Sequence, residues 1–381
     1  MHKMKLTRGI IVSRHSIVIT PILALAIVST VLNFSAESSP ATIIFELVTL
    51  LFCLAPPIRI AQPQLAITIL ATIYIFSSLI YSVALNRVDV LDFALAFKAF
   101  YYLILLSFCS RGAKIPLAKL ELFLKSLIII LAIKYSISRI ALGISRPILF
   151  TENNYELIFL LIAYYAYYTR SNTLQPLWIG LIIYIFFISG SRSSIFALAF
   201  TIFFMTIRGI DRKTLLGAVL LLASAIGAYY VFYDRLAENS IDSIDRIRFF
   251  NLFLYEVRDW GLLKYLVGSE RLTPLSSYTC GALSYYSSLM SYRGNGTCYS
   301  VALHSYILRA IFDHGILILI ALITAVALLL SKSKYSKTQI ACILGIVLIT
   351  SLSVSSLNNA YVALGLTIAL SAERQKSHMT L

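Results

Sequence analysis

The chain has 381 residues, of which 59% are hydrophobic and 13% are charged, and its mean hydropathy is +0.85. A soluble domain is about half apolar and about a quarter charged, so a soluble fold of this length could not bury this much apolar surface. A net charge of +15 would indicate nucleic-acid binding in a soluble protein. Here the basic residues follow membrane topology instead, and we expect an integral membrane protein with no nucleic-acid partner.

Apolar runs of about 17 to 23 residues recur along most of the chain, and each can cross about 30 Å of hydrocarbon as a helix. The alternation typical of barrel strands is absent. The sequence therefore predicts an all-α polytopic membrane protein, one membrane domain over residues 1–381, with about twelve transmembrane helices. The expected spans are 16–34, 41–58, 64–85, 89–109, 120–138, 153–168, 175–190, 193–207, 214–233, 305–330, 338–355 and 358–371.

Lys and Arg residues concentrate in alternate connections, such as 111–119, 208–213 and 332–337. Because basic residues are retained on the cytoplasmic side, this pattern places both termini in the cytoplasm. The longest connection, 234–303, then becomes one large loop on the outer side. The first apolar run is full length and lacks a small-residue cleavage site after it, so we expect no cleavable signal peptide.

The five cysteines fall into two groups. Cys53, Cys109 and Cys342 lie in expected spans, where a thiol is usually a small apolar side chain. Cys280 and Cys298 share the external loop, where a bacterial periplasm would oxidise them to a disulfide. Closing a loop of this size would stabilise the fold by about 3 kcal/mol in the chain-entropy model.

Several short motifs that mark nucleotide-binding or metal-binding sites are absent from the sequence. It has no phosphate loop ending in GK[ST], no HExxH, no paired CxxC and no Asp-x-Asp pair. This argues against an ATP-driven pump or a zinc enzyme, and we expect no metal and no cofactor. The sequence shows no half-chain repeat, which weakens the case for a secondary transporter.

Arg192 lies in SGSRSS (189–194), at the outer end of a tight break between two expected spans. The planar donor fork of arginine suits phosphate oxygens. An arginine that only reaches lipid head groups is the alternative interpretation.

In the loop, segment 242–272 predicts an amphipathic helix whose apolar positions are Ile247, Phe250, Leu254, Val257 and Leu262, and whose basic positions are Arg246, Arg248, Arg258 and Lys264. Contact with anionic lipid would also explain those basic residues.

Segment 303–320 carries the third group of polar residues. His304 falls at the outer mouth of the next span and could act as a general base near neutral pH. Arg309 and Asp313 are one helical turn apart, which predicts an ion pair, and His314 follows them. Among the other charged residues within or near spans, Lys98 is the deepest and the best functional candidate, ahead of Glu46, Lys125, Lys134 and Glu156.

In order and spacing these features resemble the O-antigen polymerase and O-antigen ligase superfamily of bacterial surface polysaccharide assembly. The shared features are about twelve spans, a GSRSS-type turn, a large late loop with an arginine-rich start, a short glycine element (VGSE, 267–270), and HSYIL followed by DHG. The glycine element departs from the usual GxG, and this leaves the choice between Arg246 and Arg248 open.

The resemblance implies a metal-independent, GT-C-like glycosyltransferase that polymerises undecaprenyl-diphosphate-linked repeat units at the periplasmic face of the bacterial inner membrane. Arg192 and either Arg246 or Arg248 would bind the lipid diphosphate, and His304 would assist the acceptor hydroxyl. A chain-length-determinant co-polymerase and a flippase are the implied protein partners. A ligase that transfers glycan to lipid A core is the alternative within this chemistry, and a polysaccharide flippase or secondary transporter is the alternative from another class.

Overall fold

The computed structural model describes residues 14–31, 40–55, 60–109, 114–206, 245–291, 294 and 296–374. Regular structure in these residues is helical apart from one parallel bridge between Ile115 and Ala372, so the predicted all-α class is confirmed. The helices are α1 (Arg14–Val31), α2 (Ala41–Leu54), α3 (Gln62–Leu79), α4 (Val90–Ala96), α5 (Lys98–Cys109), α6 (Leu117–Ser136), α7 (Asn153–Ser171), α8 (Pro176–Ile188), α9 (Arg192–Thr206), α11 (Asp245–Val257), α12 (Leu262–Val267), α13 (Ser277–Ala282), α14 (Tyr306–Lys332), α15 (Lys337–Ser351) and α16 (Ala360–Ser371). Short segments η1 (Ile80–Leu85) and η2 (Ile137–Ala141) extend α3 and α6, and η4 (Ser284–Leu289), η5 (Ser300–Leu303) and η6 (Ser356–Asn358) lie in connections.

Helices coincide with eleven of the twelve expected spans, and the remaining one, 214–233, lies outside the described residues. The expected number of full-length spans is nevertheless wrong for the part of the chain described. Two helices there are long and apolar enough to cross a membrane, Gln62–Leu85 and Tyr306–Lys332. Helices α4 and α5 make a third if they count as one span, although they are bent by 58°. The other apolar helices are shorter, and α6 carries four charged side chains.

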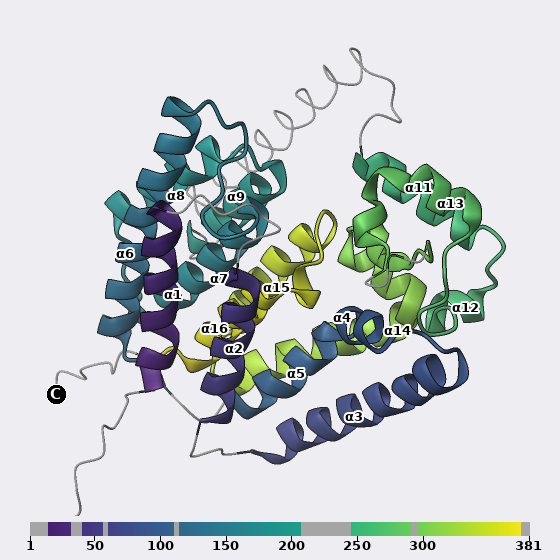
Figure 1. Cartoon of the computed structure of the whole chain (residues 1–381). Helices are drawn as coiled ribbons and strands as arrows, with labels where there is room; N and C mark the ends of the chain where they lie inside the picture. The colour runs from purple at the N-terminus through teal and green to yellow at the C-terminus, as the bar shows by residue number, and fades with distance from the viewer. Residues whose placement is uncertain are drawn as a thin grey trace, which may run out of the picture.

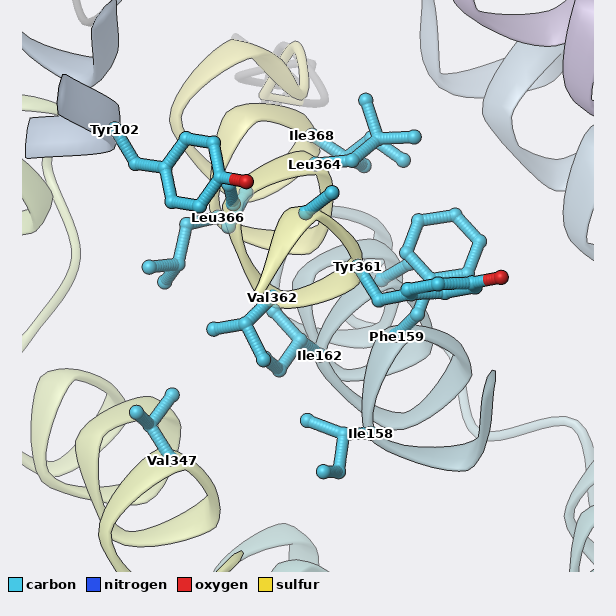
Figure 2. Close-up of a cluster of buried hydrophobic side chains, with 14 of the residues drawn as sticks. Tyr102, Ile158, Phe159, Ile162, Val347, Tyr361, Val362, Leu364, Leu366 and Ile368 are labelled. Atoms are coloured by element: carbon cyan, nitrogen blue, oxygen red, sulfur yellow. The ribbon is translucent and has the colours of Figure 1, made fainter. Parts of the chain in front are cut away.

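Helix α16 forms the centre of the fold, and all its side chains are buried. It packs against α7, α2 and α5, and Figure 2 shows Phe159 and Ile162 of α7 around Tyr361 and Val362 of α16. A Cβ on Gly365 would lie 3.3 Å from the Ile162 Cβ, so the missing side chain allows the two helices to approach closely. Twelve residues extend about 18 Å as a helix. The expected span 358–371 is thus too short to cross a bilayer alone.

Helices α11, α12 and α13 gather on one side of the molecule, away from α1, α6 and α8 (Figure 1). Together with η5 and Phe312 of α14 they enclose a second apolar core. Phe249, Leu252 and Phe253 are buried, whereas Phe250 and Leu254 are about half exposed, at 48% and 46%. Of the predicted apolar positions, Phe250 and Leu254 therefore lie on the exposed face of α11, whereas Val257 is buried. The helix predicted within 242–272 is present as two helices, α11 and α12.

The structure contains the expected disulfide between Cys280 and Cys298, with a Cα–Cα distance of 5.8 Å. It ties α13 to the part of the long loop that leads into η5 and α14. Cys53, Cys109 and Cys342 are free thiols and are buried, as expected for small apolar side chains.

Candidate functional site

Helix α14 is broken at Gly315, where φ is 80° and ψ is 166°. Gly268, directly after α12, also has a positive φ, and a Cβ there would lie 2.6 Å from the Gly315 nitrogen. The Ser269 N–H donates to the carbonyl of Phe312 over 2.7 Å, which satisfies an acceptor freed by the break. The glycine elements VGSE and DHG, far apart in sequence, therefore form one backbone contact that only glycine permits.

Arg271 reinforces this contact. Its Nη1 donates to the carbonyls of Asp313 and Val267, each over 3.2 Å. The guanidinium lies 5.2 Å from the centre of the Tyr74 ring on α3. Sequence reasoning missed Arg271, because a single loop arginine has no informative spacing. Its place directly after VGSE was the one signal that could have identified it.

Arg309 and Asp313 do not form the predicted ion pair. The ion pairs among the described residues do not include them. The Arg309 Nη1 donates to the Ser355 hydroxyl over 2.9 Å, and the Asp313 carboxylate accepts a hydrogen bond from Ser300 in η5. Spacing of i, i+4 places two side chains on one face, but here each side chain reaches a different neighbouring segment.

Three buried polar atoms on one face of α14 have no hydrogen-bond partner: the Tyr306 hydroxyl, the Arg309 Nε and the Asp313 Oδ1. Positions 306, 309 and 313 share a face because they are about one and two helical turns apart. Buried polar atoms nearly always have a partner, in the protein or in a bound molecule. A cluster of three such atoms therefore marks a place for a polar ligand or ordered water.

Residues 189–194, here called the Arg192 turn, are held in place by the first turn of α7. The Asn153 amide donates to the Ser189 carbonyl over 2.8 Å, and the Ser191 hydroxyl donates to the Asn154 Oδ1 over 2.5 Å. Between them Gly190 has a φ of 67°, and a Cβ there would lie 2.9 Å from the Ser145 carbonyl. Arg192, the first residue of α9, is thereby fixed at the start of α7, half-buried.

The same turn of α7 also meets the loop and α14. Burial raises the pKa of the Glu152 carboxyl, while a hydrogen bond from Asn154 and the charges of Arg146 and Arg246 oppose the rise. Asn154 donates this bond over 2.7 Å. The hydroxyl of Tyr155 interacts with the backbone of Ser355 and lies within electrostatic range of Arg309.

Residues 152–155 therefore bind the Arg192 turn directly, while Glu152 lies within electrostatic range of Arg246 and Tyr155 within that of Arg309. The sequence predicted the three arginines as separate features but did not identify what brings them together. The segment Glu-Asn-Asn-Tyr is short and polar and has no diagnostic spacing. Its position at the outer end of an expected span was the only available signal.

His304 lies between the apolar core around α11 and α13 and the start of α14. Its backbone φ of 56° is unusual for a residue other than glycine. The ring lies 5.3 Å from the Phe249 ring and 5.4 Å from the Tyr286 ring, and its carbonyl accepts a hydrogen bond from the Ser355 hydroxyl over 3.2 Å. Ser355 thus links the backbone of His304 to the side chain of Arg309.

The two loop arginines have different surroundings. Arg248 donates to the carbonyl of Ala282 and so fastens α11 to α13. Arg246 is exposed and acts electrostatically on Glu152. Of the two, only Arg246 influences the Glu152 carboxyl that precedes α7.

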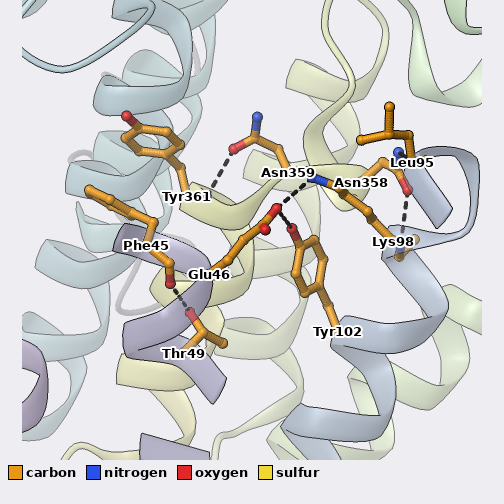
Figure 3. A network of polar contacts seen from close by, with 10 residues as sticks. Phe45, Glu46, Thr49, Leu95, Lys98, Tyr102, Asn358, Asn359 and Tyr361 are labelled. Atoms are coloured by element: carbon orange, nitrogen blue, oxygen red, sulfur yellow. Dashed lines mark hydrogen bonds and ion pairs between the residues drawn. The ribbon is translucent and has the colours of Figure 1, made fainter. Parts of the chain in front are cut away.

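Lys98 and Glu156 have structural partners. The Lys98 Nζ is 2.5 Å from the Glu46 Oε1, and the Tyr102 hydroxyl donates to the same oxygen over 3.0 Å, as Figure 3 shows. Glu156 accepts hydrogen bonds from Tyr135 and from the backbone N–H groups of residues 149, 150 and 151. These contacts hold α2 to α5 and shape the connection that precedes α7.

His314 is a core residue in this structure. Its Nδ1 is 2.9 Å from the Tyr74 hydroxyl, and its ring lies 5.0 Å from the rings of both Phe97 and Phe100. Within the described ranges, no group of three or more His, Cys, Asp or Glu residues is arranged to hold a metal ion. Comparison with protein-family models and with curated proteins finds no match for this chain.

Proposed function

We propose that the chain is a polytopic membrane glycosyltransferase that polymerises undecaprenyl-diphosphate-linked repeat units at the periplasmic face of the bacterial inner membrane. One observation carries the proposal. The start of α7 is hydrogen-bonded to the Arg192 turn and lies within electrostatic range of Arg246 and Arg309, where the outer ends of the helices are expected. The resemblance to the polymerase and ligase superfamily rests on these same residues.

Exposed apolar side chains support a membrane position for the shorter helices as well. Leu51 on α2, Ile129 on α6 and Phe187 on α8 are 58%, 44% and 77% exposed. In water such a surface would strongly favour aggregation, whereas lipid tails would cover it. We therefore propose that the shorter apolar helices belong to the membrane domain together with the two full-length ones.

The topology has a simple test in bacteria. A periplasm-active reporter fused after Arg271 should be active, and the same reporter fused after Lys334 should be silent. The opposite pattern would place the candidate site in the cytoplasm, and it would rule out a periplasmic transferase.

The proposed reaction uses a donor that already carries its leaving group. The acceptor hydroxyl oxygen attacks the anomeric carbon of the donor sugar, the bond from that carbon to the diphosphate oxygen breaks, and undecaprenyl diphosphate leaves. Negative charge develops on the diphosphate, and fixed arginines stabilise that charge better than water does. Arg192 and Arg246 have the charge and the position for this task.

The acceptor hydroxyl loses its proton during the attack. His304 is proposed as the base, and Ser355 links its backbone carbonyl to the Arg309 side chain. Glu152 is proposed as a positioning residue, because its half-buried carboxyl group lies within electrostatic range of both Arg146 and Arg246. The unpartnered atoms of Tyr306, Arg309 and Asp313 are proposed to bind polar groups of the glycan.

Binding of the lipid diphosphate tests the proposal without knowledge of the sugars. Purified protein in detergent should bind undecaprenyl diphosphate more tightly than undecaprenyl monophosphate, measured by native mass spectrometry. Arg246→Lys should weaken this preference, because lysine keeps the charge but loses the bidentate fork. Arg258→Lys is the matched control, since Arg258 is an exposed arginine of the same loop. Equal binding of both lipids by the wild type would refute the diphosphate site.

A further inference from the structure

A polar cavity lies at the end of α7 opposite to the candidate site. Its volume is about 350 Å³, and its lining includes Arg170, Lys334, Tyr335, Ser336, Gln339 and Arg374. Arg170 is in the last turn of α7, whereas Glu152 precedes the first turn. A helix of 19 residues is about 28 Å long, so this cavity is separate from the candidate site.

The cavity is strongly cationic. Arg170, Lys334 and Arg374 line it, and no carboxylate is among its lining residues. A fourth cation lies nearby: burial and the charges of Arg170 and Lys334 lower the pKa of the Lys114 ammonium, and the Glu373 carboxylate opposes this shift. Four clustered cations beside one carboxylate repel one another, and a bound anion would relieve that repulsion.

Arg170 provides an independent sign of a ligand. Its side chain is only 6% exposed, and it is held rigidly, because its Nη2 donates to the Ser333 carbonyl over 2.5 Å and its guanidinium lies 3.9 Å from the centre of the Tyr335 ring. Its Nε is buried and has no hydrogen-bond partner. A buried donor on a fixed guanidinium, at the wall of a cationic cavity, calls for an acceptor oxygen.

We propose that this cavity binds a phosphate group, either in the head group of an anionic lipid or in a soluble phosphate compound. Phosphate offers several acceptor oxygens and negative charge, which match the guanidinium of Arg170 and the cations of Lys334 and Arg374. Basic pockets between helices at the cytoplasmic side are typical sites for anionic head groups. The hydroxyl of Ser336 and the amide of Gln339 add neutral polar groups to the wall.

Thermal unfolding of the purified full chain in detergent tests this site. Cardiolipin or phosphatidylglycerol should raise the midpoint temperature more than phosphatidylcholine does if a lipid phosphate binds. Pyrophosphate should raise it relative to chloride at equal ionic strength if a soluble phosphate binds. Lys334→Gln and Arg374→Gln should each lower the apparent affinity by about tenfold. Both side chains are exposed enough for folding to be retained.

Lys337→Gln is the matched control, because Lys337 is an exposed cation in the same connection but does not line the cavity. Its response to each ligand should equal that of the wild type. Arg170→Lys should also lose the response, and if that variant does not fold, the two exposed variants decide the matter. The proposal is overturned if neither ligand class stabilises the wild type, or if Lys334→Gln and Arg374→Gln respond as strongly as Lys337→Gln.

Discussion

The backbones of Gly268 and Gly315 pack directly against each other, so the loop that precedes α14 meets this broken helix at a contact with no room for a side chain. This contact determines where the next residues of each segment lie. Arg271 can reach the carbonyl of Asp313 only because the loop approaches α14 this closely. The positions of Arg309 and Asp313 relative to the loop depend on the same contact.

Gly268→Ala and Gly315→Ala should both destabilise the protein, because each methyl group would overlap backbone atoms and each residue has a positive φ. We expect a loss of about 2–4 kcal/mol, measured by thermal or denaturant unfolding in detergent. Gly261→Ala is the control, since a Cβ there meets nothing within 4 Å. Equal stability of all three variants would show that the loop does not pack on the break.

The sequence predicted the helices well because apolar runs and polar breaks are local signals. It also predicted the disulfide, because Cys280 and Cys298 share one external segment. It identified VGSE and DHG as elements but not their contact, since nothing local indicates which distant glycine a backbone will meet. The predicted Arg309–Asp313 pair failed because spacing fixes only the shared face, and tertiary partners Ser355 and Ser300 decide where each side chain points.

Glu152→Gln should stabilise the fold at neutral pH while lowering transfer. The folded-state pKa of Glu152 is raised, so ionisation costs stability as the pH rises from the ordinary carboxyl pKa to the raised one. The variant should therefore unfold at a higher temperature than the wild type at pH 7. Below about pH 4, where the carboxyl is protonated in both states, the difference should vanish.

Activity distinguishes positioning by Glu152 from a merely structural role. Transfer by Glu152→Gln should fall about tenfold or more, because the arginines lose the charge that orients them. Glu270→Gln, which changes an exposed carboxylate of the loop, should leave both the unfolding temperature and the rate of glycan transfer unchanged. If the stabilised Glu152→Gln protein transfers glycan at the wild-type rate, Glu152 does not take part in the site.

His304→Asn should lower the rate of transfer by about 10²–10⁴ and leave binding of undecaprenyl diphosphate intact, as expected for loss of a base. Asparagine is the appropriate substitution because it tolerates a positive φ better than alanine does. Tyr285→Phe, at an exposed loop position, serves as the control. Full activity of His304→Asn at normal protein level would make the histidine a packing residue only.

Reduction of the Cys280–Cys298 bond should destabilise the loop. The bond closes a loop with a sequence separation of 18, for which the chain-entropy model gives about 3 kcal/mol. A reductant should therefore lower the unfolding temperature of the wild type and have no effect on a Cys280→Ser, Cys298→Ser double variant. Peptide mapping that finds both thiols free in protein isolated from membranes would contradict this prediction.

The central claim is that the Arg192 turn serves a polymerase, and the surface polysaccharide ladder of the source bacterium tests it most directly. Deletion of the gene should leave lipid A core that carries a single repeat unit, and the wild-type gene should restore the ladder. Arg192→Lys should fail to restore it at equal membrane protein level, because losing a bidentate contact in the transition state costs about 2–4 kcal/mol, or a factor of about 30 to 1,000 in rate. Arg258→Lys should restore the full ladder. An unchanged ladder after deletion, or core without any repeat unit, would contradict the polymerase assignment.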